Sequence, residues 1–416
     1  LKEDSCYDVA VIGGGIIGTA VAREISLRSK KYKDNINREG NRFGKTTERY
    51  TQVLSSAGVY YRPDSLKGKF SRRGTDLLVK YCDANKIPYK TCGKLVVATD
   101  ASTLKNLRIL RDRGVANKVE GLEMLWTKQR IREIEPKCNG IQALWCPKTS
   151  NVDFGIVTER FGKDFQGNGG RILLNEEVNL IAESETADHP VLIKTKRGSI
   201  VNTKYLVACG GIHSDVLSSY LEDDPKTKSV VMSLKVDYQL LKKHSIQTNI
   251  YGVPDLGMPF LGVHLTPRLD GKLLLGPGAI PAFQKEGYGN DGISFGYVKN
   301  TLSSAGFQNM TRRYLVQCLN QVKKSLWPSF QAEELQSLAE INVEDIQPGP
   351  QAVQAQLINS DGSFVDDFTF EFLQGDGIRK RVINCKFLPS PAATCSLAIA
   401  EFVVEQLLQG CEDKSI

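Results

Sequence analysis

Three glycines near the start of the chain, Gly13, Gly15 and Gly18, have the spacing of a nucleotide-binding turn. They follow the β-rich run at residues 7–12 and precede an apolar stretch with helical character that begins at Thr19. In such a strand–turn–helix unit the first glycine allows the tight turn, the second lets the backbone approach a pyrophosphate, and the third lets the helix lie close to the strand. The first amides of the helix then point at the phosphates. We predict a dinucleotide site here; the alternative is a glycine turn in an ordinary βα unit.

The elements that must position this site come from separated parts of the chain. We expect a second parallel strand within residues 30–51, although that stretch is polar and shows almost no apolar periodicity. Short strands with turns dominate residues 229–275, whereas α/β patterns recur before and after them. This pattern predicts an α/β fold: a Rossmann-like domain built from discontinuous segments, with an inserted antiparallel-sheet (α+β) substrate domain. The predicted boundaries are 1–85, 150–228 and 345–416 for the first domain, and 86–149 and 229–344 for the second.

Shorter elements follow from hydrophobic periodicity and turn residues. Expected strands lie at residues 94–98, 171–174, 190–196, 201–203 and 381–385. Expected helices lie at residues 104–113, 156–165, 297–327 and 392–408. Hairpin turns are expected at 269–272 and around Asp361-Gly362.

Composition argues against several classes of protein. The 416 residues carry a formal net charge of +7, but the basic residues form short runs, which is typical of a solvated surface; attraction to an anionic substrate or an acidic membrane face is the alternative. We find no nucleic-acid motif and no apolar run long enough to cross a bilayer. The ten cysteines form no C-x-x-C pair and there are only four histidines. We therefore expect free thiols in a reducing compartment, no metal site and no nucleic-acid partner.

Eleven short motifs between residues 57 and 394 form a distinctive set. They are AGVYYRP (57–63), SLK (65–67), IPYK (87–90), GKL (93–95), NIY (249–251), VPD (253–255), PFLGVH (259–264), TPR (266–268), DG (270–271), KEGY (285–288) and PSPAAT (389–394). Together with the glycine turn, they resemble the FAD-dependent L-2-hydroxyglutarate dehydrogenases, within the wider D-amino-acid-oxidase-like flavoproteins. The resemblance covers residues 7–408.

This resemblance implies FAD as the cofactor and a small-molecule 2-hydroxy acid, L-2-hydroxyglutarate or a similar compound, as the substrate. It implies hydride transfer to the flavin, formation of the 2-oxo acid, and passage of the electrons to a quinone or another carrier. It further implies a mitochondrial location, and peripheral association with a membrane is a related expectation.

The chain departs from the family in two cofactor-binding segments. In the family the second strand ends in an acidic residue that binds the adenosine ribose. That position falls at Arg38, with Glu39 beside it, and Glu39 is our candidate for the role. The family's His-Asn-Ser-Gly flavin loop falls near residues 50–53, which here are Tyr-Thr-Gln-Val.

Two further departures concern the substrate. The family's Pro-Phe-Arg-Gly stretch corresponds to residues 233–236, which places Lys235 where the family has arginine. The family's Gly-Pro-Ala-Gly-Val-Arg turn corresponds to residues 349–354, which places Gln354 where it has arginine. The resemblance thus implies a diverged member with a retained scaffold and a partly altered active centre.

Oxidation of a 2-hydroxy acid needs a hydride acceptor, a base for the hydroxyl proton and cations for the carboxylates. Flavin supplies the hydride acceptor. His264, expected at the end of a strand at residues 259–264, is our candidate base because imidazole titrates near working pH. The alternative is a hydrogen-bonded core histidine.

Arg268 and Lys235 are the candidate carboxylate ligands. Arginine grips a carboxylate through two parallel hydrogen bonds, whereas lysine offers a point charge. Arg268 as a surface turn residue is the competing interpretation. Tyr60 is expected to line the substrate pocket together with Tyr61, on an extended segment, with one of the two in core packing.

Two glycines and the start of the last helix are the remaining candidates for the cofactor. Gly210 and Gly211, at the end of the buried strand at residues 205–209, are expected to pass under it. The amides at the start of the last helix are expected near the flavin carbonyl, where they would stabilise negative charge on the reduced ring. These residues are Ser390, Ala392, Ala393 and Thr394; a proline-capped helix without a ligand is the alternative.

Two other functions remain open from the sequence. The altered residues are compatible with a non-catalytic relative that keeps the scaffold to bind a nucleotide or a partner. An NAD(P)-dependent reductase, with Arg38 facing a 2′-phosphate, is the third possibility, but the inserted antiparallel domain and the Pro-Ser-Pro helix start argue against it.

Overall fold

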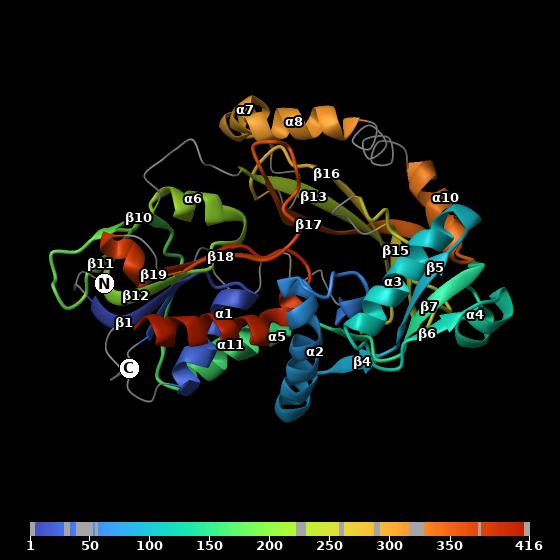
Figure 1. Cartoon of the computed structure of the whole chain (residues 1–416), viewed down its shortest axis with the longest axis horizontal. Coiled ribbons are helices and arrows are strands. Elements are labelled where there is room, and N and C mark those ends of the chain that lie inside the picture. Colours follow the sequence, from blue (N-terminus) through green and yellow to red (C-terminus); the bar gives the residue numbers. More distant parts are fainter. Residues whose placement is uncertain are drawn as a thin grey trace.

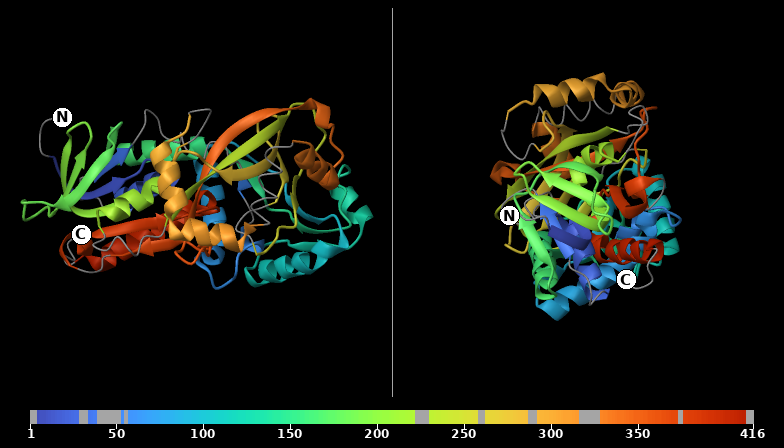
Figure 2. Two further views of the ribbon diagram at one scale, coloured as in Figure 1. Left: turned by 90° about the horizontal axis from the view of Figure 1, so that it is seen from above. Right: turned by 90° about the vertical axis from the view of Figure 1, so that its left-hand side faces the viewer.

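The computed structural model describes residues 5–28, 34–38, 53–54, 57–221, 230–257, 262–286, 292–315, 328–372 and 376–411. Two eight-stranded sheets lie toward opposite ends of an elongated molecule (Figures 1 and 2). We call the sheet with the amino-terminal strand the first sheet, and the other the second sheet. A small third sheet consists of β3 (Val53–Leu54), β8 (Ser150–Val152) and β4 (Tyr89–Thr91).

Parallel strands form the centre of the first sheet. β1 (Ser5–Ile12) pairs in parallel with β2 (Asp34–Arg38) on one side and with β12 (Ile200–Ala208) on the other. The carboxyl ends of β1 and β12 therefore meet at one edge, which is where open α/β sheets bind ligands. The other parallel strands are β9 (Arg171–Leu174) and β19 (Val382–Phe387), and the antiparallel ones are β10 (Val178–Glu183), β11 (Val191–Thr195) and β18 (Thr369–Glu371).

Helices cover one face of the first sheet, and the apolar side chains between helices and sheet form one continuous core. Val9, Val11 and Val207 of the sheet pack in one cluster with Phe161 and Ile399 of the helices. These helices are α1 (Ile16–Arg28), α2 (Leu66–Asn85), α5 (Phe154–Gly167) and α11 (Ala392–Gly410). The last helix of the chain, α11, lies against both α1 and α2 (Figure 1). On the opposite face, α6 (Ser214–Ser219) contributes Leu217 to a separate core.

The second sheet is antiparallel except for one parallel pair, β5 with β14. In spatial order its strands are β17 (Ile346–Ile358), β13 (Val230–Leu241), β16 (Leu273–Pro281), β15 (His264–Pro267), β14 (Asn249–Gly252), β5 (Lys94–Ala98), β7 (Gln142–Cys146) and β6 (Glu123–Leu125). The helices not yet named are α3 (Leu104–Ala116), α4 (Lys128–Ile134), α7 (Phe295–Ser303), α8 (Ala305–Arg313) and α10 (Pro328–Leu338).

The two faces of the second sheet differ in character around β5. Leu95 and Val97 point into an apolar core with Ile131 of α4 and Leu335 of α10. Their neighbours Val96 and Ala98 pack on the other face, against α3 and the short helical turn η2 (Ala57–Val59). Because side chains alternate along a strand, Lys94 shares the face of Val96. None of the helices in the described ranges combines the length and apolar character that crossing a bilayer requires.

Most of the predicted elements are confirmed. The weakly supported second strand exists as β2, in parallel with β1. The strand expected at 94–98, the helices at 104–113, 156–165 and 392–408, and the two hairpin turns are present. The nine cysteines in the described ranges are free thiols.

Three expectations need correction. The helix expected at 297–327 is interrupted at Ser304, whose side chain caps α8, and residues 316–327 lie outside the described residues. His264 begins strand β15 rather than ending a strand. Residues 349–354, expected as a turn, lie within β17. The domain boundaries stay a prediction, although β17, assigned to the first domain, is hydrogen-bonded to β13 of the second sheet.

Close packing between α2 and α11 can be tested at one glycine. A Cβ added at Gly74 would lie 2.6 Å from the Cα of Cys395 and 2.7 Å from the carbonyl oxygen of Thr394, both backbone atoms. We expect Gly74→Ala to lower the free energy of unfolding in urea by roughly 1–3 kcal/mol. Gly167→Ala is the matched control, because a Cβ there meets nothing within 4 Å; equal stabilities for the two variants would contradict this packing.

Candidate functional site

The glycine turn between β1 and α1 is built from contacts that exclude side chains. Gly13 has φ +111°, and a Cβ there would lie 2.2 Å from the carbonyl oxygen of Cys209. A Cβ at Gly18 would lie 1.8 Å from the carbonyl oxygen of Gly13. Gly15 accepts the first helical hydrogen bond of α1 from Thr19, at 3.0 Å. The turn is thus as tight as expected, and the first turn of α1 contains no acidic residue that would repel a phosphate.

The second glycine pair lies beside this turn. The amide of Cys209 donates to the carbonyl of Ile12 at 2.7 Å, so the chain leaving β12 runs next to the end of β1. Gly210 packs against α6, since a Cβ there would lie 2.6 Å from Leu217. Gly211 has φ +54°, and a Cβ there would meet nothing within 4 Å. The structure therefore brings Gly13, Gly210 and Gly211 together at the carboxyl edge of the first sheet.

The amino end of α11 has the features of an anion site. Pro391 stands at its N-cap and makes no side-chain capping hydrogen bond, whereas Ser65, Thr127 and Asp153 cap their own helices. The first residues of α11 are small, and the first turn holds no acidic residue. The amide of Ala392 donates to the carbonyl of Pro389 at 2.9 Å, so the amides of Ala393 and Thr394, at the positive end of a 19-residue helix, are the ones that suit the flavin carbonyl. These residues thus fit FAD; Glu39 and residues 50–52 lie outside the described residues, and Arg38 ends β2.

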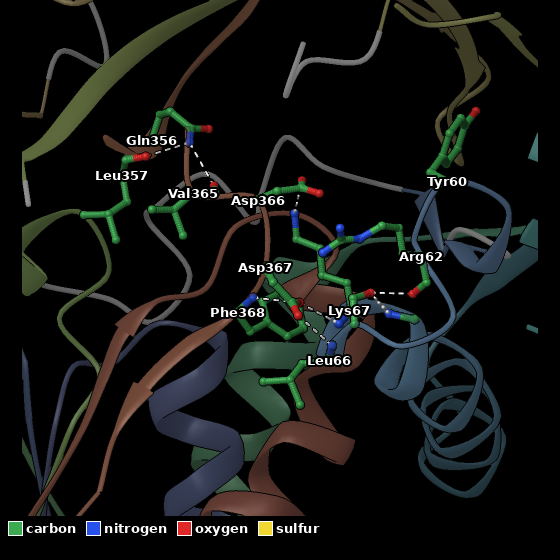
Figure 3. A network of polar contacts seen from close by, with 12 residues as sticks. Tyr60, Arg62, Leu66, Lys67, Gln356, Leu357, Val365, Asp366, Asp367 and Phe368 are labelled. Carbon is green, nitrogen blue, oxygen red and sulfur yellow. Dashed lines mark hydrogen bonds and ion pairs between the residues drawn. The ribbon is translucent and has the colours of Figure 1, made fainter. Parts of the chain in front are cut away.

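A network of polar contacts fixes the start of α2 close to this point (Figure 3). The carboxylate of Asp367 accepts hydrogen bonds from the amides of Leu66 and Lys67 at 2.8 and 2.9 Å. The ammonium of Lys67 lies 3.5 Å from Asp366 and 5.4 Å from the ring centre of Tyr61. Burial lowers the pKa of Lys67, while the field of Asp366 raises it.

A second cluster lies on the Lys94 face of the second sheet. His264 of β15 is paired with Tyr251 of β14, and their rings stack in parallel with centres 4.2 Å apart. The ammonium of Lys94 lies 4.5 Å from the ring centre of Tyr251 and 4.9 Å from that of Tyr60. The hydroxyl of Tyr60 is buried without a hydrogen-bond partner among the described residues. An unpaired buried hydroxyl is costly, so this one is suited to bonding a ligand.

His264 has the form that a proton acceptor needs. Its Nδ1 lies 3.2 Å from the carbonyl oxygen of Gly262, which makes Nδ1 the protonated nitrogen and leaves a lone pair on Nε2. Burial lowers the pKa of this histidine to about 4; the Gly262 hydrogen bond raises it, and the charge of Lys94 lowers it. Burial likewise lowers the pKa of Lys94 to about 8.

Two adjacent tyrosines connect the two clusters. Tyr60 contacts Lys94 of the second sheet, whereas Tyr61 lies near Lys67 and close to Ser390, which precedes α11. Their ring centres are 6.4 Å apart in an edge-on arrangement. The sequence predicted an extended segment here, but the two tyrosines directly follow the helical turn η2. Both tyrosines are therefore part of the candidate site.

The side chains that hold this tyrosine segment come from the end of α3. Arg113 donates to the carbonyl of Tyr60 at 2.7 Å, and Asn117 donates to the carbonyl of Tyr61 at 2.9 Å. These hydrogen bonds hold the backbone that carries the two rings against the end of α3.

The expected carboxylate ligands have other partners in the structure. Arg268 follows β15 at the end opposite His264, and its guanidinium lies 3.1 Å from Asp270 in the hairpin turn. Arg268 also lines a recess with Asp153, Glu159 and Lys272. Lys235 lies on β13 with its ammonium 3.5 Å from Asp237. Gln354 lies within β17, opposite Leu234 of β13. The structure thus brings His264 and Tyr60 to one cluster, but not Arg268.

Reasoning from sequence missed Lys94, Tyr251 and Lys67 as members of the site. Each lies in a motif that carried the resemblance, but their burial was not visible there. One signal was available: Lys94 opens an otherwise apolar strand, and its period-two partner Val96 is buried. A lysine on the buried face of a strand is rare unless it is paired or functional.

Comparison with known proteins agrees with this geometry. A family model described as FAD dependent oxidoreductase matches residues 8–341. The chain is 36% identical to "L-2-hydroxyglutarate dehydrogenase, mitochondrial" of Bos taurus, over 97% of this chain and 89% of that protein. It is 35% identical to the protein of the same name from Caenorhabditis elegans, over 97% of this chain and 93% of that one.

A solved structure with the same fold is the dithionite-reduced L-alpha-glycerophosphate oxidase from Mycoplasma pneumoniae with FAD bound. Its TM-score is 0.76, with 20% sequence identity over 97% of this chain and 95% of that chain. The chain therefore belongs to the L-2-hydroxyglutarate dehydrogenase family of FAD dependent oxidoreductases. Its cofactor is FAD, which sets aside the NAD(P)-dependent alternative.

The carboxylate network at α2 can be tested by stability. We expect Asp367→Ala to lower the free energy of unfolding by roughly 1–3 kcal/mol, because two backbone amides at the start of α2 lose their acceptor. Asp64→Ala is the matched control, since this carboxylate lies near the same helix but is 81% exposed. A loss of equal size in both variants would show that Asp367 does not anchor the helix.

The neutral, buried state of His264 can be tested by the pH dependence of unfolding. Below pH about 6.5 the imidazole of the unfolded chain takes up a proton, whereas the folded one stays neutral until pH about 4. This group therefore makes the protein less stable as pH falls from about 6.5 to 4. We expect the free energy of unfolding to drop over this range by about 3 kcal/mol more in the wild type than in His264→Gln. Identical profiles would show that the imidazole is not buried in neutral form.

Proposed function

We propose that this protein oxidises L-2-hydroxyglutarate, or a similar 2-hydroxy acid, to the corresponding 2-oxo acid. The observation that carries the proposal is the cluster of His264, Tyr251, Tyr60 and Lys94 on one face of the second sheet. This cluster combines a neutral proton acceptor, an unpaired hydroxyl and a cation, which are the groups that an anionic hydroxy acid needs.

FAD, when bound, supplies the acceptor for the hydride that leaves the substrate Cα. In our proposal, Gly13, Gly15, Gly18, Gly210 and Gly211 pass close to its phosphates and sugars. The start of α11, from Ser390 to Thr394, would hold its ring carbonyl through backbone amides. The same helix end favours extra negative charge there.

The chain's own residues would handle the hydroxyl group. Nε2 of His264 takes the hydroxyl proton as the Cα–H bond breaks, so that the C–O bond becomes a carbonyl. The hydroxyl of Tyr60 donates a hydrogen bond to the oxygen that is losing its proton. The substrate carboxylates are drawn to this face by Lys94. Lys235 and Arg268 stay candidates for the more distant carboxylate, each in exchange for its present aspartate partner.

A neutral histidine with a lowered pKa is a weak base on its own. An anionic substrate changes this, because its carboxylates add negative charge beside the imidazole and favour the protonated form. We therefore propose that His264 takes up its proton only when the substrate is bound. The electrons would pass from the flavin to a quinone or another carrier. A mitochondrial location follows the names of the relatives, and peripheral contact with a membrane would bring the protein to a quinone.

The proposal is tested by the colour of the purified protein. We expect a flavin absorption spectrum that bleaches when L-2-hydroxyglutarate is added without oxygen, and that does not bleach with D-2-hydroxyglutarate. A flavin spectrum that no 2-hydroxy acid bleaches would contradict the proposal and favour a non-catalytic relative.

His264→Gln tests the proton acceptor. We expect this variant to keep its flavin spectrum but to lose about 10²–10⁴-fold in the rate of bleaching, the usual contribution of a general base. His189→Gln, in a turn remote from the cluster, is the matched control. Bleaching of His264→Gln at the wild-type rate would show that another group takes the proton.

A further inference from the structure

A buried lysine is unusual, and Lys94 is only 1% exposed. Its ammonium lies above the rings of Tyr60 and Tyr251, at 4.9 and 4.5 Å from their centres. Cation–π contacts of this kind return part of the free energy that an ammonium loses when it leaves water. Lysine side chains are rarely buried to this degree, and one that lies beside the candidate base points to a function.

The ring of Tyr251 lies between Lys94 and His264. β14 is paired with β5 on one side and with β15 on the other, so the three residues come from three successive strands. The imidazole is stacked on Tyr251 with an angle of 4° between the rings, and the ammonium lies over the same ring. The distance from the ammonium to the imidazole centre therefore cannot exceed the sum of 4.5 and 4.2 Å. Two charges this close interact appreciably in a buried setting.

We propose that Lys94 is a positioning residue for His264: its ammonium, held over the Tyr251 ring, opposes a second positive charge and keeps the imidazole as a neutral proton acceptor. This inference rests on the proposed role of His264 as the base. An anionic substrate would offset the charge of Lys94, so that proton uptake by the imidazole becomes coupled to substrate binding. Lys94 would in this way suppress protonation of the base while the site is empty.

The surroundings of His264 support this assignment. The titratable groups on the neighbouring elements are Tyr251 of β14, Tyr238 of β13, Lys94 of β5 and Tyr60 after η2, with the thiols of Cys92 and Cys146 close to the tyrosine and the lysine. Burial keeps the phenols uncharged, since it raises the pKa of Tyr238 to about 12 and also raises that of Tyr251. Burial likewise raises the pKa of the Cys92 thiol. Among the described residues, Lys94 is thus the charged side chain whose field acts on the imidazole.

The direct test is an NMR titration of the FAD-loaded protein with ¹³C-labelled histidine, without substrate. The signal of His264 is assigned by its loss in His264→Gln. In the wild type we expect this signal to stay at its neutral position down to pH 5. In Lys94→Met the midpoint should move upward by about half a unit to one unit, because the repelling charge is gone. An unchanged midpoint in Lys94→Met would overturn the proposal.

Matched variants separate charge from packing. Lys94→Arg keeps the positive charge and should titrate like the wild type, and Lys90→Met removes an exposed lysine of β4 and should do so too. Lys94→Gln is the second neutral variant, and its midpoint should also rise if Lys94→Met does not fold. A midpoint raised equally by Lys90→Met would show a general charge effect and would overturn the specific role of Lys94.

The melting temperature gives a second readout, which distinguishes the charge of Lys94 from a purely structural role. The field of a buried ammonium is lost in both neutral variants and kept in Lys94→Arg, so we expect the pH-dependent loss of melting temperature between pH 6.5 and 5 to be smaller in Lys94→Met and Lys94→Gln than in the wild type and Lys94→Arg. The same pH dependence in all four proteins, with only a uniform offset in melting temperature, would assign Lys94 to structure instead. Neither measurement uses a substrate, so both test the role of Lys94 even if no 2-hydroxy acid bleaches the flavin and the proposed activity fails.

Discussion

The contact between Tyr60 and Tyr61 is the interaction on which the two halves of the candidate site depend. Tyr60 meets the second sheet through Lys94, and Tyr61 meets the start of α11 through Ser390. Their carbonyls are bonded to side chains of α3. Without this pair, the glycine edge of the first sheet and the histidine face of the second would be two separate features of a large molecule. The pair thus links the two features that we propose to form one site.

The site combines tight backbone packing with buried polar groups that cost stability. Around the cofactor segments, glycines at positions 13 and 18 allow contacts that no side chain would permit. At the second sheet, Lys94 and His264 of its strands and the hydroxyl of Tyr60, which packs against it, are held away from water. Apolar cores on both sheets offset this cost, because the opposite face of β5 and the helices of the first sheet are densely apolar. Such a division between a stabilising core and a strained or desolvated site is common in enzymes.

The sequence was most informative where local chemistry decides the structure. The glycine spacing, the alternating strands and the hairpin turns follow from backbone sterics and periodicity, and they are confirmed. The polar strand β2 was harder to predict because its place in the sheet comes from pairing with β1 and β9, not from its own residues. Lys94 and Tyr251 could not be assigned to a common cluster beforehand, since only the pairing of β5, β14 and β15 brings them together. Arg268 illustrates the opposite case: its residue type suited a carboxylate, but the hairpin supplies Asp270 at 3.1 Å.

The glycine edge of the first sheet and the histidine face of the second sheet are the two features on which the proposed chemistry depends. The central claim is that these two features border one site. Its most direct test is a crystal structure of the FAD-loaded protein with 2-oxoglutarate bound. We expect the flavin ring between the start of α11 and the second sheet, with the 2-oxo oxygen within hydrogen-bonding reach of Nε2 of His264 and the hydroxyl of Tyr60. A flavin ring or a bound acid lying away from this histidine face would contradict the account.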